Sequence, residues 1–178
     1  MNARRPAAVM IAIAQRAPHG IIFIQRSEEM RSHAGQIGLP GGGMDDIDAG
    51  DLRATALREM HEEVGVAPEL VTIIAQLPDI RARINRYVVT PFVAVYEQTP
   101  LVIDGSETVG VFTVPLHTVL TELRDGLTEY AGLSIPTPIL DFGDHHIWGL
   151  TGLILASFVG RWKDGELART VEAMLHHA

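Results

Sequence analysis

The stretch Arg58-Glu59-Met60-His61-Glu62-Glu63-Val64-Gly65-Val66 decides the fold, and it closely follows the glycine run Pro40-Gly41-Gly42-Gly43. At about 100° per residue, a helix places Glu59 and Glu63 on nearly the same line, with Glu62 beside them. An adjoining apolar stripe repeats every four residues: Leu52, Ala56, Met60 and Val64. The stripe should face a core, so the acids lie at the border of the buried face.

Carboxylates at this spacing suit a divalent cation. Like charges four residues apart cost an isolated helix roughly 0.2–0.5 kcal/mol per pair, and a bound cation reverses that sign. Hard cations such as Mg²⁺ bind through a few carboxylates together with substrate phosphates. Arg58 lies one turn before Glu62, so we expect the two to pair. A solvated surface is the alternative for the acids alone, but the apolar stripe and the glycine run favour a phosphate and metal site.

The segment Arg58–Val66 matches the end of the Nudix box without exception, so the chain resembles the Nudix hydrolases. The upstream half departs from that pattern, because Met44 and Gly50 stand where the box has a glycine and a glutamate. If the box begins at Gly42 or Gly43 instead of Met44, its first residue is the expected glycine. Four acids could replace the glutamate, and the residues alone do not choose among them: Asp45, Asp46, Asp48 and Asp51.

A second motif, upstream of the box, resembles the coenzyme A pyrophosphatase branch of this superfamily. Its matching positions are Arg26, Ser27, Arg31, Gly35 and Pro40-Gly41-Gly42. The likeness extends from about Ala7 to Phe158. It implies an α+β fold, a Nudix-type α/β/α sandwich with a mixed sheet, and cleavage of coenzyme A or its derivatives to 3′,5′-ADP and 4′-phosphopantetheine. The substrate would be held by Arg26, Arg31, Gly41 and Gly42.

The resemblance also implies the catalytic set. Glu59, Glu62 and Glu63 would hold Mg²⁺ or Mn²⁺, with Arg58 orienting Glu62 and a carbonyl of Gly42 or Gly43 as a further ligand. The base that takes a proton from the attacking water is either Glu59 or Glu107. Glu107 lies in a loop where the family often carries acids, and Gly110 stands where a second Glu is common.

Composition fits an enzyme domain spanning residues 1–178. Hydrophobic residues make up 47%, and the net charge of −8 argues against nucleic-acid binding, which needs a basic footprint. The chain has no cysteine, which excludes thiolate catalysis and makes a reducing cytoplasm the expected location. We expect neither a secretory signal nor a membrane span, since the apolar stretch Ala7–Ala14 is about half the length that a span needs.

Periodicity and turn residues predict the remaining elements. Ser32–Gly43 is expected to be a loop and Tyr130–His146 an irregular segment, while Pro91 suggests an edge strand or a bulge. The predicted strands are Ala7–Ala14, Gly20–Gln25, Val71–Leu77, Arg86–Tyr96, Val109–Val114 and His146–Trp148. The predicted helices are Asp51–Val64, Leu116–Arg124, Thr151–Arg161 and Glu166–His177.

Other functions and sites remain open on the sequence. Within the same chemistry the substrate could be ADP-ribose, NADH, another dinucleotide or a deoxynucleoside triphosphate. The chain could also be a non-catalytic nucleotide sensor or a regulatory interaction domain that uses its apolar C-terminal helix. That helix could belong to the core or form the contact of a homodimer. Arg81, Arg83 and Arg86 could bind phosphates or end a strand in solvent. His145-His146 lacks a third metal ligand, so surface or packing roles are expected, and His176-His177 is expected to be a frayed tail. Trp148 is expected in the core.

Overall fold

The computed structural model of the chain describes residues 4–29, 35–81, 87–103 and 105–175. Its strands are β1 (Arg5–Ala14), β2 (Gly20–Arg26), β3 (Ile37–Gly38), β4 (Gly41–Gly43), β5 (Val71–Gln76), β6 (Ile80–Arg81), β7 (Tyr87–Tyr96), β8 (Thr108–Pro115), β9 (Arg124–Tyr130), β10 (Leu133–Phe142) and β11 (His145–Ile147). Its helices are α1 (Leu52–Val64), α2 (Leu116–Glu122), α3 (Gly149–Lys163) and α4 (Glu166–Leu175), with 3₁₀ turns η1 (Asp46–Asp48) and η2 (Pro68–Leu70).

The larger sheet is mixed. Strand β1 runs parallel to β7, in register from Arg5 opposite Tyr87 to Ala14 opposite Tyr96. Strands β2 and β4 pair with β1 in the antiparallel sense, and β8 pairs with β2 in the same sense. The path β3-β2-β1-β7-β5 therefore places β1 at the centre, and the short strand β4 also pairs with it.

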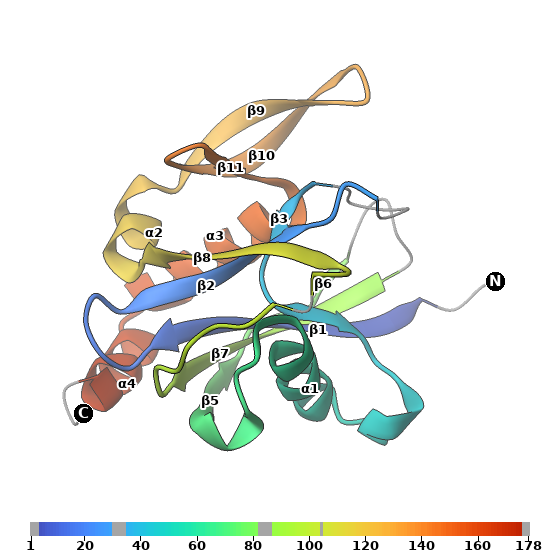
Figure 1. Ribbon diagram of the computed structural model, residues 1–178. Coiled ribbons are helices and arrows are strands. Elements are labelled where there is room, and N and C mark those ends of the chain that lie inside the picture. The colour runs from blue at the N-terminus through green and yellow to red at the C-terminus, as the bar shows by residue number, and fades with distance from the viewer. Residues whose placement is uncertain (1–3, 30–34, 82–86, 104, 176–178) are drawn as a thin grey trace.

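Both faces of this sheet are buried, and alternate residues of β1 serve opposite cores. Ala8, Met10 and Ala12 belong to the apolar cluster that includes α1. Ile11 and Ile13 belong to the cluster that includes α3 and α4. Figure 1 shows α1 and α3 on opposite sides of the sheet. This two-residue alternation between helix layers confirms the predicted α/β/α sandwich with a mixed sheet.

Two segments predicted to be irregular contain strands. The expected loop Ser32–Gly43 includes β3 and β4, whose glycines gave no apolar alternation to read. The expected irregular segment Tyr130–His146 contains β10 and the start of β11. Strand β10 forms a hairpin with the preceding strand β9, which Figure 1 shows projecting from the main sheet. Trp148 is only half-buried; it lies beside Tyr130, with ring centroids 5.4 Å apart, so placing it in the core was wrong.

Pro91 lies in an interior strand, so the edge alternative was wrong, whereas the register of β5 shifts between Ile73 and Ala75, opposite residues 93 and 94 of β7. Strand β7 pairs with β1 on one side and with β5 and β6 on the other. The carbonyl of Pro91 accepts a hydrogen bond from the Leu77 N–H, in the gap between β5 and β6. A proline lacks the N–H for a ladder, and the interruption of the neighbouring strand removes the need for it.

The C-terminal helix packs on its own chain. Leu167 and Val171 of α4 are buried in the cluster shared with α3, and Met174 and Leu175 pack partly against it. Its apolar side therefore belongs to the core among the described residues. In that part of the chain, no helix combines the length and the apolar character needed to cross a membrane.

Candidate active site

Helix α1 carries the acids and is well defined at both ends. The Asp51 carboxylate accepts a hydrogen bond from the Arg53 N–H at the start, and Gly65 ends the helix in the left-handed conformation with φ 75°. Ala56, Met60 and Val64 are completely buried against the sheet. The predicted stripe thus fixes the helix rotation, so that Glu59 and Glu63 point along the border of the core.

The glycine strand β4 lies directly against these acids. A Cβ atom on Gly42 would lie 2.4 Å from Oε1 of Glu59, so only glycine leaves room for that carboxylate. Gly41 has φ 153°, and a Cβ there would lie 2.3 Å from the Ala8 carbonyl oxygen. The two glycines therefore allow close approach on both sides, to the carboxylate of α1 and to the backbone of β1.

Glu63 is the most buried acid of the helix motif. Its Oε2 accepts a hydrogen bond of 2.8 Å from the Gly41 N–H, and its Oε1 lies 3.7 Å from Nη1 of Arg26. Burial raises the pKa of Glu63 to about 7, and the negative charge of Glu59 adds to the rise, while the Gly41 bond and Arg26 oppose it. Burial also raises the pKa of Glu59. Additional positive charge near this pair would stabilise both carboxylates.

Arg58 links the helix, the glycine strand and the turn η1. Its guanidinium binds Asp48 through two bonds, Nε to Oδ1 at 2.9 Å and Nη2 to Oδ2 at 3.0 Å. Nη1 donates to Glu59 and to Glu62, each at 2.9 Å. Nη2 also donates to the Gly43 carbonyl at 3.1 Å. The predicted pairing of Arg58 with Glu62 is confirmed, and the Gly43 carbonyl is already engaged by this side chain.

Among the four aspartates left open by the sequence, Asp48 is the one that pairs with Arg58. Its side chain is 2% exposed and also accepts bonds from the Thr55 hydroxyl and the Asp45 N–H, each at 2.9 Å. Hydrogen bonds from Arg58 hold the pKa of Asp48 well below its usual range, against the effect of burial. The spacing of the Nudix box indicates Gly50 instead, because η1 adds residues before the helix.

The other predicted residues divide into near and distant ones. Glu107 precedes β8 and is largely exposed, with Oε2 3.8 Å from Nη2 of Arg26, so Arg26 lies between Glu63 and Glu107. Glu62 is half-exposed on the outer side of Arg58. Arg31 lies outside the described residues, as do Arg83, Arg86 and the pair His176-His177, whereas Arg81 is exposed at the end of β6.

A divalent cation suits the donor set of Glu59 and Glu63. Both are carboxylates, the ligands that hard cations prefer. Glu63 is buried and Glu59 half-buried, so an uncompensated negative charge there is costly. Within the described ranges, no three His, Cys, Asp or Glu side chains are already grouped to hold a metal. Phosphate oxygens of a substrate would have to complete the coordination of such an ion.

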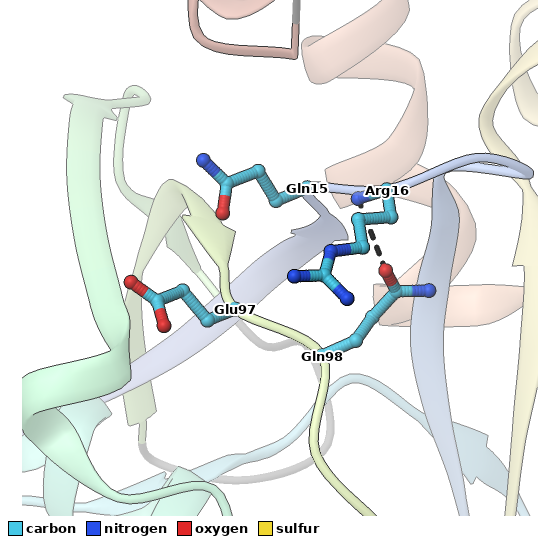
Figure 2. A pocket seen from close by; sticks show the side chains of 4 residues that line it. All are labelled: Gln15, Arg16, Glu97 and Gln98. Carbon is cyan, nitrogen blue, oxygen red and sulfur yellow. Dashed lines mark hydrogen bonds between the residues drawn. The ribbon is translucent and has the colours of Figure 1, made fainter. Parts of the chain in front are cut away.

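A small polar hollow of about 220 Å³ lies at the opposite end of β1 and β7 from the glycine strand. It is lined by Gln15, Arg16, Glu97 and Gln98, and Figure 2 shows these side chains around it, with the Arg16 N–H donating to Gln98 Oε1 at 3.1 Å. The glycine strand pairs with β1 at residues 7–9, whereas these side chains follow the strand ends. The hollow is therefore separate from the acids.

His145 and His146 were expected to have ordinary packing or surface roles, and they do. The ring of His145 stacks on Phe112 with centroids 3.8 Å apart. His146 Nδ1 lies 2.5 Å from Asp141 Oδ1, and Asp141 also accepts a bond from Arg124. These contacts join β11 to β8 and to β10.

Comparisons with known proteins agree with this fold. The NUDIX domain family matches residues 3–131. The uncharacterized Nudix hydrolase NudL of Escherichia coli (strain K12) is 36% identical over 163 residues, covering 85% of this chain and 79% of NudL. The NUDIX domain of Shewanella oneidensis NrtR, solved in complex with ADP ribose, is similar with a TM-score of 0.54 and 22% identity, over 67% of this chain and 78% of that one. A MutT/nudix family protein from Enterococcus faecalis reaches a TM-score of 0.61 at 17% identity, over 92% of this chain and 64% of that one.

The two solved structures are distant in sequence and support the fold, whereas the family match and NudL show the relationship. The chain belongs to the Nudix family. It is a hydrolase that acts on the diphosphate bond of nucleoside diphosphate derivatives.

Proposed function

We propose that the substrate is coenzyme A or one of its derivatives, cleaved at its diphosphate to 3′,5′-ADP and 4′-phosphopantetheine. The motif around Arg26, Ser27 and Gly41 is the support for this substrate, because it resembles the coenzyme A branch of the family. In the structure, Arg26 lies beside Glu63, so this upstream motif and the helix motif meet at one place. That meeting is the observation on which the proposal rests.

We assign the metal to Glu59 and Glu63, with Glu62 assisting from the outer side of Arg58. Nudix hydrolases generally use divalent metal ions, and Mg²⁺ or Mn²⁺ is the expected one here. When bound, such an ion would neutralise the diphosphate and make a coordinated water more acidic. Side chains of the protein hold the carboxylates in position: Arg58 donates hydrogen bonds to Glu59 and Glu62, and Asp48 in turn fixes Arg58.

Two carboxylates remain candidates for the base. Glu59 lies against Gly42 and is held by Arg58, while Glu107 is exposed beside Arg26. Phosphoryl transfer needs chiefly an aligned water and charge neutralisation, so either group could accept the proton of the water. Arg26 would orient the substrate's phosphates, as would Arg31. The backbone of Gly41 and Gly42 would allow their close approach.

The experiment is product analysis with Mg²⁺ and, separately, Mn²⁺, on coenzyme A, ADP-ribose, NADH and a panel of deoxynucleoside triphosphates. Selective release of 3′,5′-ADP from coenzyme A, abolished in Glu63→Gln, is the expected result. Preferred cleavage of ADP-ribose, the ligand in the NrtR complex, would refute coenzyme A as the substrate and would be consistent with diphosphate hydrolysis. Unchanged turnover in Glu63→Gln would refute the metal assignment.

We further propose that residues 1–178 act as one catalytic domain in the cytoplasm. The shared apolar cluster of α3, α4 and the central sheet supports a common unit. A homodimer stays a prediction that sedimentation equilibrium would test.

A further inference from the structure

The glycine strand separates the acids from an aromatic side chain on the other face of the sheet. A Cβ on Gly43 would lie 3.5 Å from Cε1 and 3.6 Å from Oη of Tyr87, so the ring edge faces this glycine. The preceding residue, Gly42, faces Glu59 on the α1 side. Tyr87 is half-buried and packs against the cluster of α3 and α4. Two consecutive glycines thus open onto two different neighbours.

A cation accompanies this tyrosine. The Arg5 Cζ lies 5.7 Å from the centre of the Tyr87 ring, and the two residues are in register as the first residues of β1 and β7. Arg5 is exposed, and within the described residues no carboxylate lies at ion-pair distance from it. The chain contains 22 acids against 14 lysines and arginines. A cation on an aromatic face, with no acid partner in the part of the chain that the structure describes, is therefore a feature that a ligand anion could use.

The two glycines that Glu59 and Tyr87 approach are adjacent in β4. Consecutive Cα atoms are about 3.8 Å apart, and their side chains point to opposite faces. The Glu59 carboxylate and the Tyr87 ring each approach one of these two glycines closely. Arg58 donates to the Gly43 carbonyl and so fixes the edge over which a substrate would pass. A nucleoside attached to a diphosphate has the shape to extend from one side to the other.

We propose that Tyr87 and Arg5 form the subsite for the nucleoside end of the substrate. Tyr87 contacts the adenosine, and Arg5 binds the phosphate on its 3′ oxygen, the group that distinguishes coenzyme A from dephospho-coenzyme A. This inference rests on the proposed function, because it presupposes a 3′-phosphorylated adenosine. Both residues lie outside the box and outside the upstream motif.

Calorimetric binding of 3′,5′-ADP and of 5′-AMP tests the subsite without requiring turnover. The wild-type protein should bind 3′,5′-ADP about tenfold more tightly, the effect of one charge-assisted contact. Arg5→Gln should bring the two affinities within about twofold of each other. Arg16→Gln, an exposed arginine just after the other end of β1, is the matched control and should keep the preference. Equal affinities for wild type, no binding of either nucleotide, or the same loss in Arg16→Gln would overturn the proposal.

A second pair of variants separates ring contact from folding. Tyr87→Phe should keep the KM for coenzyme A within about twofold, whereas Tyr87→Leu should raise KM about tenfold with little change in kcat. Melting temperatures of both variants show whether the ring is only structural; an equal KM in Tyr87→Leu overturns its role. Wild-type protein that binds 3′,5′-ADP through Arg5 but leaves coenzyme A intact would refute the proposed function and retain the subsite. Cleavage of coenzyme A by a protein that does not prefer 3′,5′-ADP would support the proposed function and refute the subsite.

Discussion

Replacing Glu63 by glutamine should stabilise the metal-free protein at pH 8 and not at pH 4. The pKa of Glu63 rises from an ordinary 4.5 to about 7, chiefly because the carboxyl is buried. Folding therefore favours the protonated form. The metal-free wild type should lose stability as the pH rises from about 4.5 to about 7, and below that window the carboxyl is protonated in both states.

The size of the effect follows from the same shift. Each pKa unit corresponds to about 1.4 kcal/mol, so ionised Glu63 lowers the free energy of unfolding at pH 8 by about 3 kcal/mol. Glutamine keeps an oxygen for the Gly41 N–H and carries no charge. For a protein of this length, the melting temperature of Glu63→Gln should exceed that of wild type by roughly 6–12 °C at pH 8.

Thermal unfolding in the presence of a chelator, at pH 4 and pH 8, measures this difference. Glu62→Gln is the matched control, because Glu62 is the adjacent residue and half-exposed, and its surface pairing contributes little. Mg²⁺ added at pH 8 should raise the melting temperature of wild type and not that of Glu63→Gln. An equal difference between Glu63→Gln and wild type at both pH values would refute the reasoning, since it would show that ionisation of Glu63 is not the cause.

Three further predictions concern other residues of the candidate site. Asp48→Asn should destabilise the protein by about 3 kcal/mol at neutral pH and lower kcat, because it leaves Arg58 without its buried partner. The pKa of Asp48 is lowered in the folded state, so the difference in stability between this variant and wild type should shrink as the pH falls below about 4. Urea titrations at pH 3 and pH 7 measure that difference. Gly42→Ala should reduce kcat at least tenfold, because its Cβ would displace the Glu59 carboxylate. The control Gly160→Ala, in open space within α3, should leave activity unchanged and raise stability by about 0.5–1 kcal/mol. Steady-state kinetics and melting curves measure both variants. If Glu107 is the base, Glu107→Gln should lower kcat about a hundredfold or more with little change in melting temperature, and full activity in this variant would leave Glu59 as the candidate.

The layer architecture and the helix of the site could be predicted from the sequence because their signals are local. The four-residue repeat that ends at Val64 fixes which side of α1 is buried, and Asp51 and Gly65 mark its ends. The strand β1 was found from a short apolar run, although its alternation between two cores is visible only once the helices are placed. The carboxylates Glu59 and Glu63 followed from the helical period.

The remaining contacts depend on pairing between distant residues. The choice of Asp48 among the four aspartates required knowledge of the path of η1. That turn places Asp48 against Arg58, which lies ten positions later in the chain. The strand β10 was missed because it contains Pro136 and Pro138, which lower the strand signal. These prolines are two residues apart, so their missing N–H groups fall on one edge, and along residues 133–139 the strand is paired only with β9. The nearness of Tyr87 to Gly43 likewise depends on the parallel pairing of β1 and β7.

The hydrogen bond from the Gly41 N–H to Glu63 gives the site its own spectroscopic probe. That amide proton belongs to the backbone and points at a carboxylate that lies 22 positions further along the chain. Its chemical shift should therefore follow the charge state of Glu63, and its exchange with solvent should slow when a ligand covers the strand. Nuclear magnetic resonance of a single glycine would then report occupancy of the site without any label on the substrate or any change to a side chain.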